Sequence, residues 1–169
     1  MRLGLLQGSL SPDSHTAVVM RAVRDAAKDF TVEWLDLRER NAEFCDGRDL
    51  EEYGEETRKL AAALATCDAY VIGFPVYNYS VSGVVKNVVD ICSHGMRGKV
   101  AGLVSNSGGV RSFMASVDLM KILSYHDSIM VVQPTVHTWD QDFQDERLAN
   151  PKVHEKIQAM LAAIRRELR

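Results

Sequence analysis

Hydroxyl-bearing residues cluster in the stretch GSLSPDSHT, residues 8–16, directly after a short apolar run. The hydroxyl groups belong to Ser9, Ser11, Ser14 and Thr16. Gly8 permits a tight turn, and a helix is predicted to begin within the stretch, where free N–H groups and the helix dipole favour an anion. Because lysine and arginine are absent, the stretch suits a phosphate monoester held by hydrogen bonds. An ordinary helix cap at Ser14 or His15 is the alternative interpretation.

A second group of polar and aromatic residues follows an apolar run, in FPVYNYSVSGVVKN, residues 74–87. Its candidate binding residues are Pro75, Val76, Tyr77 and Asn78. Tyr77 and Tyr79 could cover or edge a flat ring, and Asn78 could hydrogen-bond to the polar edge of that ring. Gly83 allows a close approach of the chain. The alternative is that the tyrosines only cover a surface or a subunit contact.

The third group is SNSGGVRS, residues 105–112, which again combines small hydroxyl residues with glycines. Its candidate residues are Ser105, Asn106, Ser107, Gly108 and Gly109. Paired glycines can leave backbone N–H groups facing a ligand, although a flexible turn has the same composition. Together the three groups predict a site for a phosphate tail and a planar polar ring. Neither GxGxxG nor GxxxxGK[ST] is present, which argues against a dinucleotide fingerprint and a nucleoside triphosphate site.

Short apolar runs alternate with helix-length segments, and this alternation is what positions the three groups. The apolar runs predict strands over residues 3–7, 30–37, 69–74, 99–105 and 128–132. The segments between them predict helices over residues 16–28, 51–66, 81–93, 113–123 and 151–169. Residues 134–149 are acidic and irregular, and we expect a loop there.

Strict alternation predicts an α/β fold, with a doubly wound, five-stranded parallel sheet and helices on both faces. Such a sheet binds ligands at the carboxyl ends of its strands, where all three polar groups would meet. The 169 residues suit one domain, residues 1–169.

Composition excludes several classes of function. Net charge is −3 without a basic run, so sequence-independent nucleic-acid binding is not expected. No apolar segment is long enough to span a bilayer, and the N-terminus lacks the pattern of a signal peptide, so we expect a cytoplasmic protein.

Neither a metal site nor a covalent catalytic site is indicated by the sequence. Cys45, Cys67 and Cys92 are widely spaced, form no CxxC pair and are expected to be reduced, mostly buried thiols. The five histidines are scattered, without HExxH spacing. We see no GxSxG elbow or Ser-His-Asp arrangement and assign no catalytic acid, base or nucleophile.

In chain order, GSLSPDSHT, PVYNYSVSGVVKNVVD and SNSGGVRS resemble the NADPH-dependent FMN reductase family of flavodoxin-like proteins. This family includes quinone reductases that are similar to azoreductases and chromate reductases. The resemblance covers nearly the whole chain, and the P-x-Y-N-x-S-x-x-G-x-x-K-N-x-x-D run is its most specific part. It implies a flavodoxin-like fold that binds FMN non-covalently.

The resemblance also assigns roles to the three groups of residues. It places the FMN phosphate on Ser9, Ser11, Ser14, His15 and Thr16. It places the isoalloxazine ring against Pro75, Val76, Tyr77 and Asn78, with the 105–109 segment at the ring's polar edge. NADPH or NADH would pass hydride to flavin N5, and a small acceptor such as a quinone or free flavin would take the electrons. A homodimer or homotetramer is implied as well, with loops 38–50 and 134–149 shaping the acceptor pocket.

One position departs from the family, which commonly has arginine where this chain has Ser11, in a GSxR pattern. The preference for NADPH over NADH therefore stays open, as does the affinity for flavin, and Arg111 is one candidate substitute. Two other functions stay open. One is a flavin-binding electron carrier or redox sensor without direct NAD(P)H activity. The other is a protein of the same fold class that binds a different phosphorylated ligand.

Overall fold

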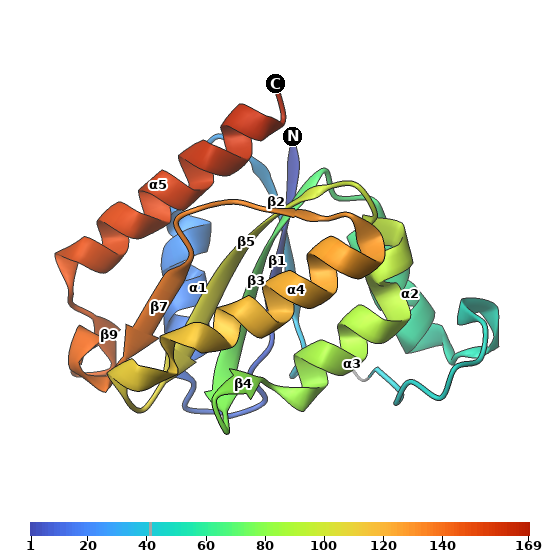
Figure 1. The fold of residues 1–169 in the computed structure, drawn as a ribbon, viewed down its shortest axis with the longest axis horizontal. Helices are drawn as coiled ribbons and strands as arrows, with labels where there is room; N and C mark the ends of the chain where they lie inside the picture. The colour runs from blue at the N-terminus through green and yellow to red at the C-terminus, as the bar shows by residue number, and fades with distance from the viewer. Residues whose placement is uncertain (41) are drawn as a thin grey trace.

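The computed structural model describes residues 1–40 and 42–169, and a mostly parallel sheet runs through its centre (Figure 1). The strands are β1 (Arg2–Gln7), β2 (Thr31–Asp36), β3 (Ala69–Tyr77), β4 (Ser80–Val81), β5 (Val100–Ser107), β6 (Met130–Val131), β7 (Val136–Trp139), β8 (Phe143–Gln144) and β9 (Arg147–Leu148). The α-helices are α1 (His15–Ala26), α2 (Glu55–Ala65), α3 (Gly83–Cys92), α4 (Ala115–Asp127) and α5 (Pro151–Glu167). Short 3-10 helices are η1 (Leu50–Glu52), η2 (Ser93–Met96), η3 (Val110–Met114) and η4 (Asp140–Asp142).

The strand order is β2-β1-β3-β5-β6, with the pairs along this path parallel. This is the flavodoxin-like doubly wound order, in which the direction of winding reverses between β1 and β3. The predicted fold class, a flavodoxin-like sheet with five strand positions, is therefore confirmed.

Two apolar layers hold helices on opposite faces of the sheet, and Figure 1 shows α4 crossing the face away from α1. On one face, side chains of α1 and α5 such as Met20 and Ile157 pack on Leu5 and Val71. On the other face, α2, α3 and α4 pack on a different set of strand residues. This second layer includes Leu60, Val88, Leu119, Ile72 and Leu103. The alternation along each strand therefore directs side chains into both layers, as a parallel sheet requires.

The fifth position of the sheet differs from the expectation, because two short strands share it. β6 pairs with Val100 and Ala101 at the start of β5, and β7 pairs with the 104–107 end. Pro134 lies between them and has no N–H to donate to a ladder, so the strand is interrupted there. The prediction that residues 134–149 form a loop was wrong, since they contain β7, η4 and the β8-β9 hairpin.

The region after β3 also differs, because β3 continues three residues beyond the expected strand. Residues Tyr77 and Ser80 pair across a hairpin whose turn is Asn78 and Tyr79. Both turn residues have positive φ, 49° and 65°, as a type I′ turn requires. The stretch expected to be a loop is therefore a short antiparallel hairpin that leads into α3.

Candidate functional site

The three polar groups of the sequence meet at the carboxyl ends of β1, β3 and β5, as the topology predicts. A shallow hollow of about 200 Å³ lies there. Its lining comprises Ser9, Ser11, Asp13, Ser14, His15, Thr16, Pro75, Val76, Tyr77, Asn106, Ser107 and Gly108. We call it the switch-point hollow. Eleven of the fourteen predicted site residues line it, all except Asn78, Ser105 and Gly109.

The first loop starts at Gly8, where any side chain would meet neighbouring atoms. Gly8 N–H donates to the Gly73 carbonyl at 2.8 Å, which ties the loop to β3. A Cβ at this position would lie 2.1 Å from Val85 Cγ2 and 2.7 Å from the Gly73 oxygen. The close approach fixes where the following serines lie.

Buried Gln7 holds Ser9 in place, a role that the sequence did not indicate. Ser9 N–H donates to Gln7 Oε1 at 2.7 Å, and Gln7 Nε2 donates to the Ser9 carbonyl at 2.9 Å. Gln7 Nε2 also donates to Asp36 Oδ1, and Arg38 donates to both carboxylate oxygens of Asp36. Burial opposes ionisation of Asp36, but hydrogen bonds from Arg38 and Gln7 outweigh it and hold its pKa below the usual value.

The start of α1 leaves hydrogen-bond donors at the hollow. Ser14 is the N-cap, and its Oγ accepts from Ala17 N–H at 3.1 Å. Within the described residues no acceptor contacts the N–H groups of His15 and Thr16, which belong to the first turn, where a helix has no internal partners. The imidazole of His15 stacks on Phe143 with ring centroids 4.0 Å apart. The main chain of this turn therefore has free N–H groups that an anion could contact.

The second loop contributes an apolar wall. Pro75 is buried at the end of β3, and Val76 and Tyr77 follow it along the lining. Tyr77 is 58% exposed and Tyr79 is 69% exposed, so neither ring is held in the protein core. Asn78 lies at the turn of the hairpin and outside the lining, so its predicted contact with a ring edge gains no support from this geometry.

The third loop ends β5 and is fixed by a polar network. Ser105 is fully buried, with its Oγ 2.9 Å from His137 Nδ1 and 3.2 Å from Ser116 Oγ. Ser107 Oγ donates to the Gly109 carbonyl at 2.7 Å and lies 3.4 Å from His137 Nε2.

The glycines of this loop are exposed. In the part of the chain that the structure describes, the N–H groups of Gly108 and Gly109 contact no acceptor. Ser105 therefore fixes the loop from the protein interior, whereas Ser107 and the glycine backbone are the groups available to a ligand.

His137 is the residue that sequence reasoning missed. It lies on β7 directly opposite Ser105 in the parallel register, so both serines reach its ring. Burial lowers its pKa; the Asp142 carboxylate acts in the opposite direction, and Lys156 lowers it further. A neutral imidazole can donate at one nitrogen and accept at the other, as a bridge between two hydroxyl groups requires.

Few charges lie in the switch-point hollow. Its lining has no lysine or arginine, and the exposed Asp13 is its one carboxylate. Arg111 is exposed on η3 and does not line the hollow, so its proposed substitution for the missing arginine gains no support.

Burial raises the pKa of the Cys92 thiol to about 12, and Cys67 is buried too, whereas Cys45 is exposed. No cluster of three or more metal-binding side chains occurs in residues 1–40 and 42–169.

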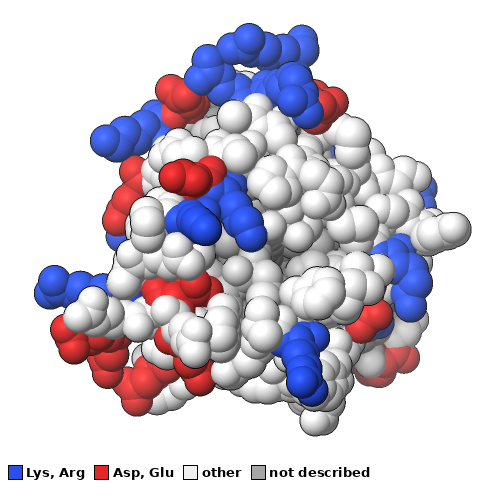
Figure 2. All heavy atoms as spheres, turned by 60° about the vertical axis from the view of Figure 1, so that its left-hand side comes forward, with Lys and Arg blue, Asp and Glu red and all other residues white. Residues whose placement is uncertain are grey.

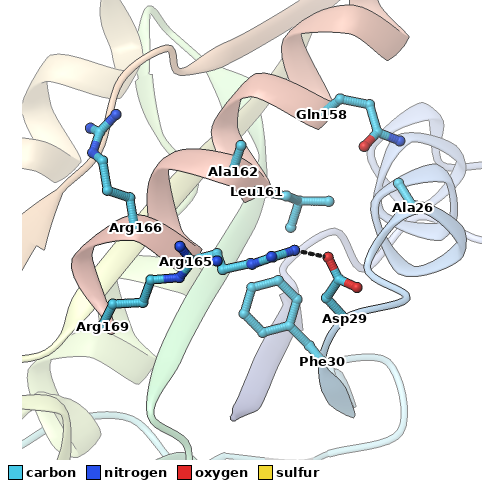
Figure 3. Close-up of a pocket in the computed structure, with 9 residues that line it drawn as sticks. All are labelled: Ala26, Asp29, Phe30, Gln158, Leu161, Ala162, Arg165, Arg166 and Arg169. Atoms are coloured by element: carbon cyan, nitrogen blue, oxygen red, sulfur yellow. Dashed lines mark hydrogen bonds and ion pairs between the residues drawn. The ribbon is translucent and has the colours of Figure 1, made fainter.

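A larger hollow of about 500 Å³ lies at the opposite end of the sheet, between the end of α1 and the last turns of α5 (Figure 3). There Arg165 forms an ion pair with Asp29, above Phe30. Figure 2 shows acidic side chains gathered at the lower left of this face, whereas basic side chains are spread over its top, centre, sides and lower part. No described helix is both long and apolar enough to cross a membrane.

The fold and the hollow define a doubly wound α/β protein with a hydroxyl-rich loop and a helix N-terminus at its topological switch point, where proteins of this class bind phosphorylated cofactors. The family model for NADPH-dependent FMN reductase matches residues 1–144. This chain belongs to the NADPH-dependent FMN reductase family.

Curated relatives agree with this assignment, and a solved structure shares the fold. An NAD(P)H-dependent FAD/FMN reductase of Geobacillus thermodenitrificans is 28% identical over 162 residues, covering 93% of this chain and 88% of the relative. An FMN-dependent NADPH-azoreductase of Staphylococcus saprophyticus is 29% identical over 148 residues, covering 83% and 78%. The flavoenzyme NAD(P)H:(acceptor) oxidoreductase FerB of Paracoccus denitrificans shares the fold, with a TM-score of 0.78 at 20% identity and coverage of 98% and 97%.

Proposed function

We propose that this chain is an FMN-dependent NAD(P)H oxidoreductase that reduces a small acceptor such as a quinone or free flavin. The observation that carries the proposal is the switch-point hollow, where a cation-free hydroxyl loop, a helix N-terminus and an apolar wall converge. The names of the reductase and azoreductase relatives support the same chemistry.

The donor set fits a flavin mononucleotide. The hydroxyls of Ser9, Ser11 and Ser14 and the first N–H groups of α1 would hold the phosphate. The wall from Pro75 to Tyr77 would receive the ring, and the N–H groups of Gly108 and Gly109 would face its polar edge. The hollow of about 200 Å³ is smaller than the roughly 300–1,000 Å³ of typical ligand pockets. It would enclose one end of the cofactor and leave the rest accessible to other reactants.

FMN would supply the redox chemistry, accepting a hydride at N5 from the nicotinamide and passing the electrons to the acceptor. The protein's part is binding and orientation. The third loop is held in place by the hydrogen bonds among Ser105, Ser116 and His137. The first loop is held by Gln7. We assign no side chain as a general acid or base.

A homodimer or homotetramer belongs to the same proposal and is supported by exposed apolar residues beside the site, among them Tyr79, Met114 and Val117. We also propose a cytoplasmic location, because metabolism supplies NAD(P)H there. Part of the acceptor pocket would be formed by segments 38–50 and 134–149; residue 41 of the first segment lies outside the described residues.

The test is a visible absorbance spectrum of protein saturated with FMN and freed of excess flavin, under anaerobic conditions. We expect a retained flavin spectrum that bleaches on addition of NADPH or NADH, and the two rates rank the donors. Retained flavin that does not bleach would instead support an electron carrier or redox sensor. A spectrum without retained flavin, together with no NAD(P)H oxidation when free FMN is supplied, would overturn the proposal.

A further inference from the structure

Another hollow lies close to the switch-point hollow, although no residue lines both. It has a volume of about 440 Å³ and runs between β7, η3 and the start of α5, and we call it the β7 hollow. Ser107 lines the first hollow, His137 lines the second, and the two side chains are 3.4 Å apart. A ligand in the β7 hollow would therefore lie next to the loop that forms the third part of the proposed flavin site.

Two lysines give the β7 hollow a positive charge that the switch-point hollow lacks. Lys152 and Lys156 are exposed, and they lie one turn apart on α5, so both reach its lining. Neither lysine forms an ion pair with any carboxylate of residues 1–40 and 42–169.

The carboxylate in the same lining is already bonded within the protein. Asp142 is 5% exposed and accepts hydrogen bonds from Trp139 N–H at 3.0 Å and Asn150 Nδ2 at 2.6 Å. Its charge offsets one lysine at most, so the hollow keeps a net positive charge and two ammonium groups that an anion can contact.

Aromatic side chains form the other part of the lining. Phe113 is 57% exposed on η3, and Trp139 is half-buried at the end of β7. An exposed phenyl ring and an indole offer flat apolar area, which aromatic ligands use for stacking or edge contacts. Lysines and aromatic rings in one hollow are complementary to a ligand that is itself aromatic and anionic.

We propose that the β7 hollow binds an aromatic group bearing a phosphate or sulfonate, with the anion on Lys152 and Lys156 and the ring against Phe113 and Trp139. This inference rests on the proposed function and specifies its substrates. The ligand has two sources in such an enzyme: the phosphorylated adenosine end of NADPH, or an anionic aromatic electron acceptor. The first loop contains no lysine or arginine, so these lysines would supply a positive charge that it lacks.

Calorimetric titration with two probes tests the binding directly. The probes are adenosine 2′,5′-bisphosphate and anthraquinone sulfonate, each added to FMN-loaded protein and to protein without FMN. We expect at least one probe to bind, and the Lys152→Gln/Lys156→Gln double variant to weaken its binding by about tenfold or more, since charge-assisted hydrogen bonds are lost. Lys121→Gln, at an exposed lysine on α4, is the matched control and should leave affinity unchanged.

A fluorescence measurement reports on the aromatic contact independently of charge. The chain has two tryptophans, so a Trp34→Phe variant leaves Trp139 as the only indole. The probe that binds by calorimetry should change the Trp139 emission, with the same midpoint. Failure of both probes to bind, affinity unaffected by the double lysine variant, or silent Trp139 emission would each overturn the inference.

Steady-state kinetics then distinguish the two sources. If the ligand is the donor, the double variant raises the KM for NADPH about tenfold or more and leaves the KM for NADH unchanged. If it is the acceptor, the KM for anthraquinone sulfonate rises while that for uncharged menadione does not. Failure of the proposed function would give a different result: the protein would retain no flavin and oxidise no NAD(P)H. Probe binding to protein without FMN is measured independently of flavin retention and of NAD(P)H oxidation.

Discussion

Ser14 both caps α1 and lines the switch-point hollow, so one substitution should affect stability and cofactor binding together. Ser14→Ala removes the acceptor for Ala17 N–H and should lower the free energy of unfolding by about 1 kcal/mol. It also removes a hydroxyl from the proposed phosphate site and should weaken FMN binding. Urea unfolding and flavin fluorescence titration measure the two effects.

Ser14→Asp separates these roles. Aspartate is an equally good N-cap and its charge favours a helix N-terminus, so stability should return to that of the natural chain. The same carboxylate repels a phosphate, so FMN affinity should fall below that of Ser14→Ala. Equal FMN affinity in the aspartate variant and the natural chain would show that no phosphate lies at this end of α1.

His137 makes stability depend on pH in a defined direction. Its pKa lies below the ordinary value of 6.5 in the folded chain because of burial and Lys156, which outweigh Asp142. The unfolded chain therefore binds the proton more readily. The stability that neutral His137 contributes is complete above about pH 6.5 and is lost as pH falls below it.

Asparagine at position 137 can keep a hydrogen bond to Ser105 but does not titrate in this range. We expect the free energy of unfolding of the natural chain to fall more steeply than that of His137→Asn as pH falls below about 6.5. Urea unfolding at several pH values gives both curves. Parallel curves over this pH range would contradict a depressed pKa at His137.

At the scale of elements, Gly8 is where β1, β3 and α3 meet. Gly8→Ala brings a Cβ to 2.1 Å from Val85 Cγ2 and 2.7 Å from the Gly73 oxygen, so the first loop must shift. We expect a loss of about 1–3 kcal/mol in the free energy of unfolding, as in other overpacked cores.

Adding Val85→Ala should restore only part of this stability, because the backbone contact at Gly73 stays. Gly83→Ala is the matched control, since a Cβ at the first position of α3 meets no atom within 4 Å. That substitution should be neutral or stabilising by about 0.4–1 kcal/mol. Urea midpoints of the variants compare them, and equal stability of Gly8→Ala and Gly83→Ala would refute the packing argument.

The secondary-structure elements differ in how well the sequence predicts them. Continuous apolar runs such as residues 69–74 belong to strands buried on both faces, so their position and the three loops after them followed directly from the pattern. β7 did not, because Pro134 interrupts the fifth strand position and only Val136 and Thr138 of its four residues are buried. His137 could not be related to Ser105 without the parallel register that places them opposite each other.

The hairpin after β3 was missed for a different reason. The turn requires positive φ at two successive residues, for which Asn-Gly is the usual sequence, and here Tyr79 occupies the glycine position. A tyrosine in this conformation carries a steric cost that a sequence pattern does not reveal. The type of each residue in the site was therefore predictable, whereas the conformation of the turn that holds Asn78 away from the hollow was not.

At the scale of the whole molecule, an exposed apolar surface adjoins the site and bears on assembly. Ser80 Oγ donates to Asp118 Oδ2 at 2.7 Å, which holds the β3-β4 hairpin against the start of α4. Around this bond Tyr79, Met114 and Val117 are 69%, 55% and 46% exposed. Apolar side chains gathered in this way mark an interaction surface more often than isolated ones do.

We expect the chain to sediment as a dimer or tetramer, and Val117→Glu to shift it toward monomer, because an unpaired charge in an interface is costly. Sedimentation velocity over a range of concentrations measures the shift, and circular dichroism verifies that the fold is kept. Tyr125→Glu is the control on the same helix, since Tyr125 is 90% exposed and lies two turns beyond Val117. A monomeric natural chain, or equal dissociation by both variants, would contradict assembly through this surface.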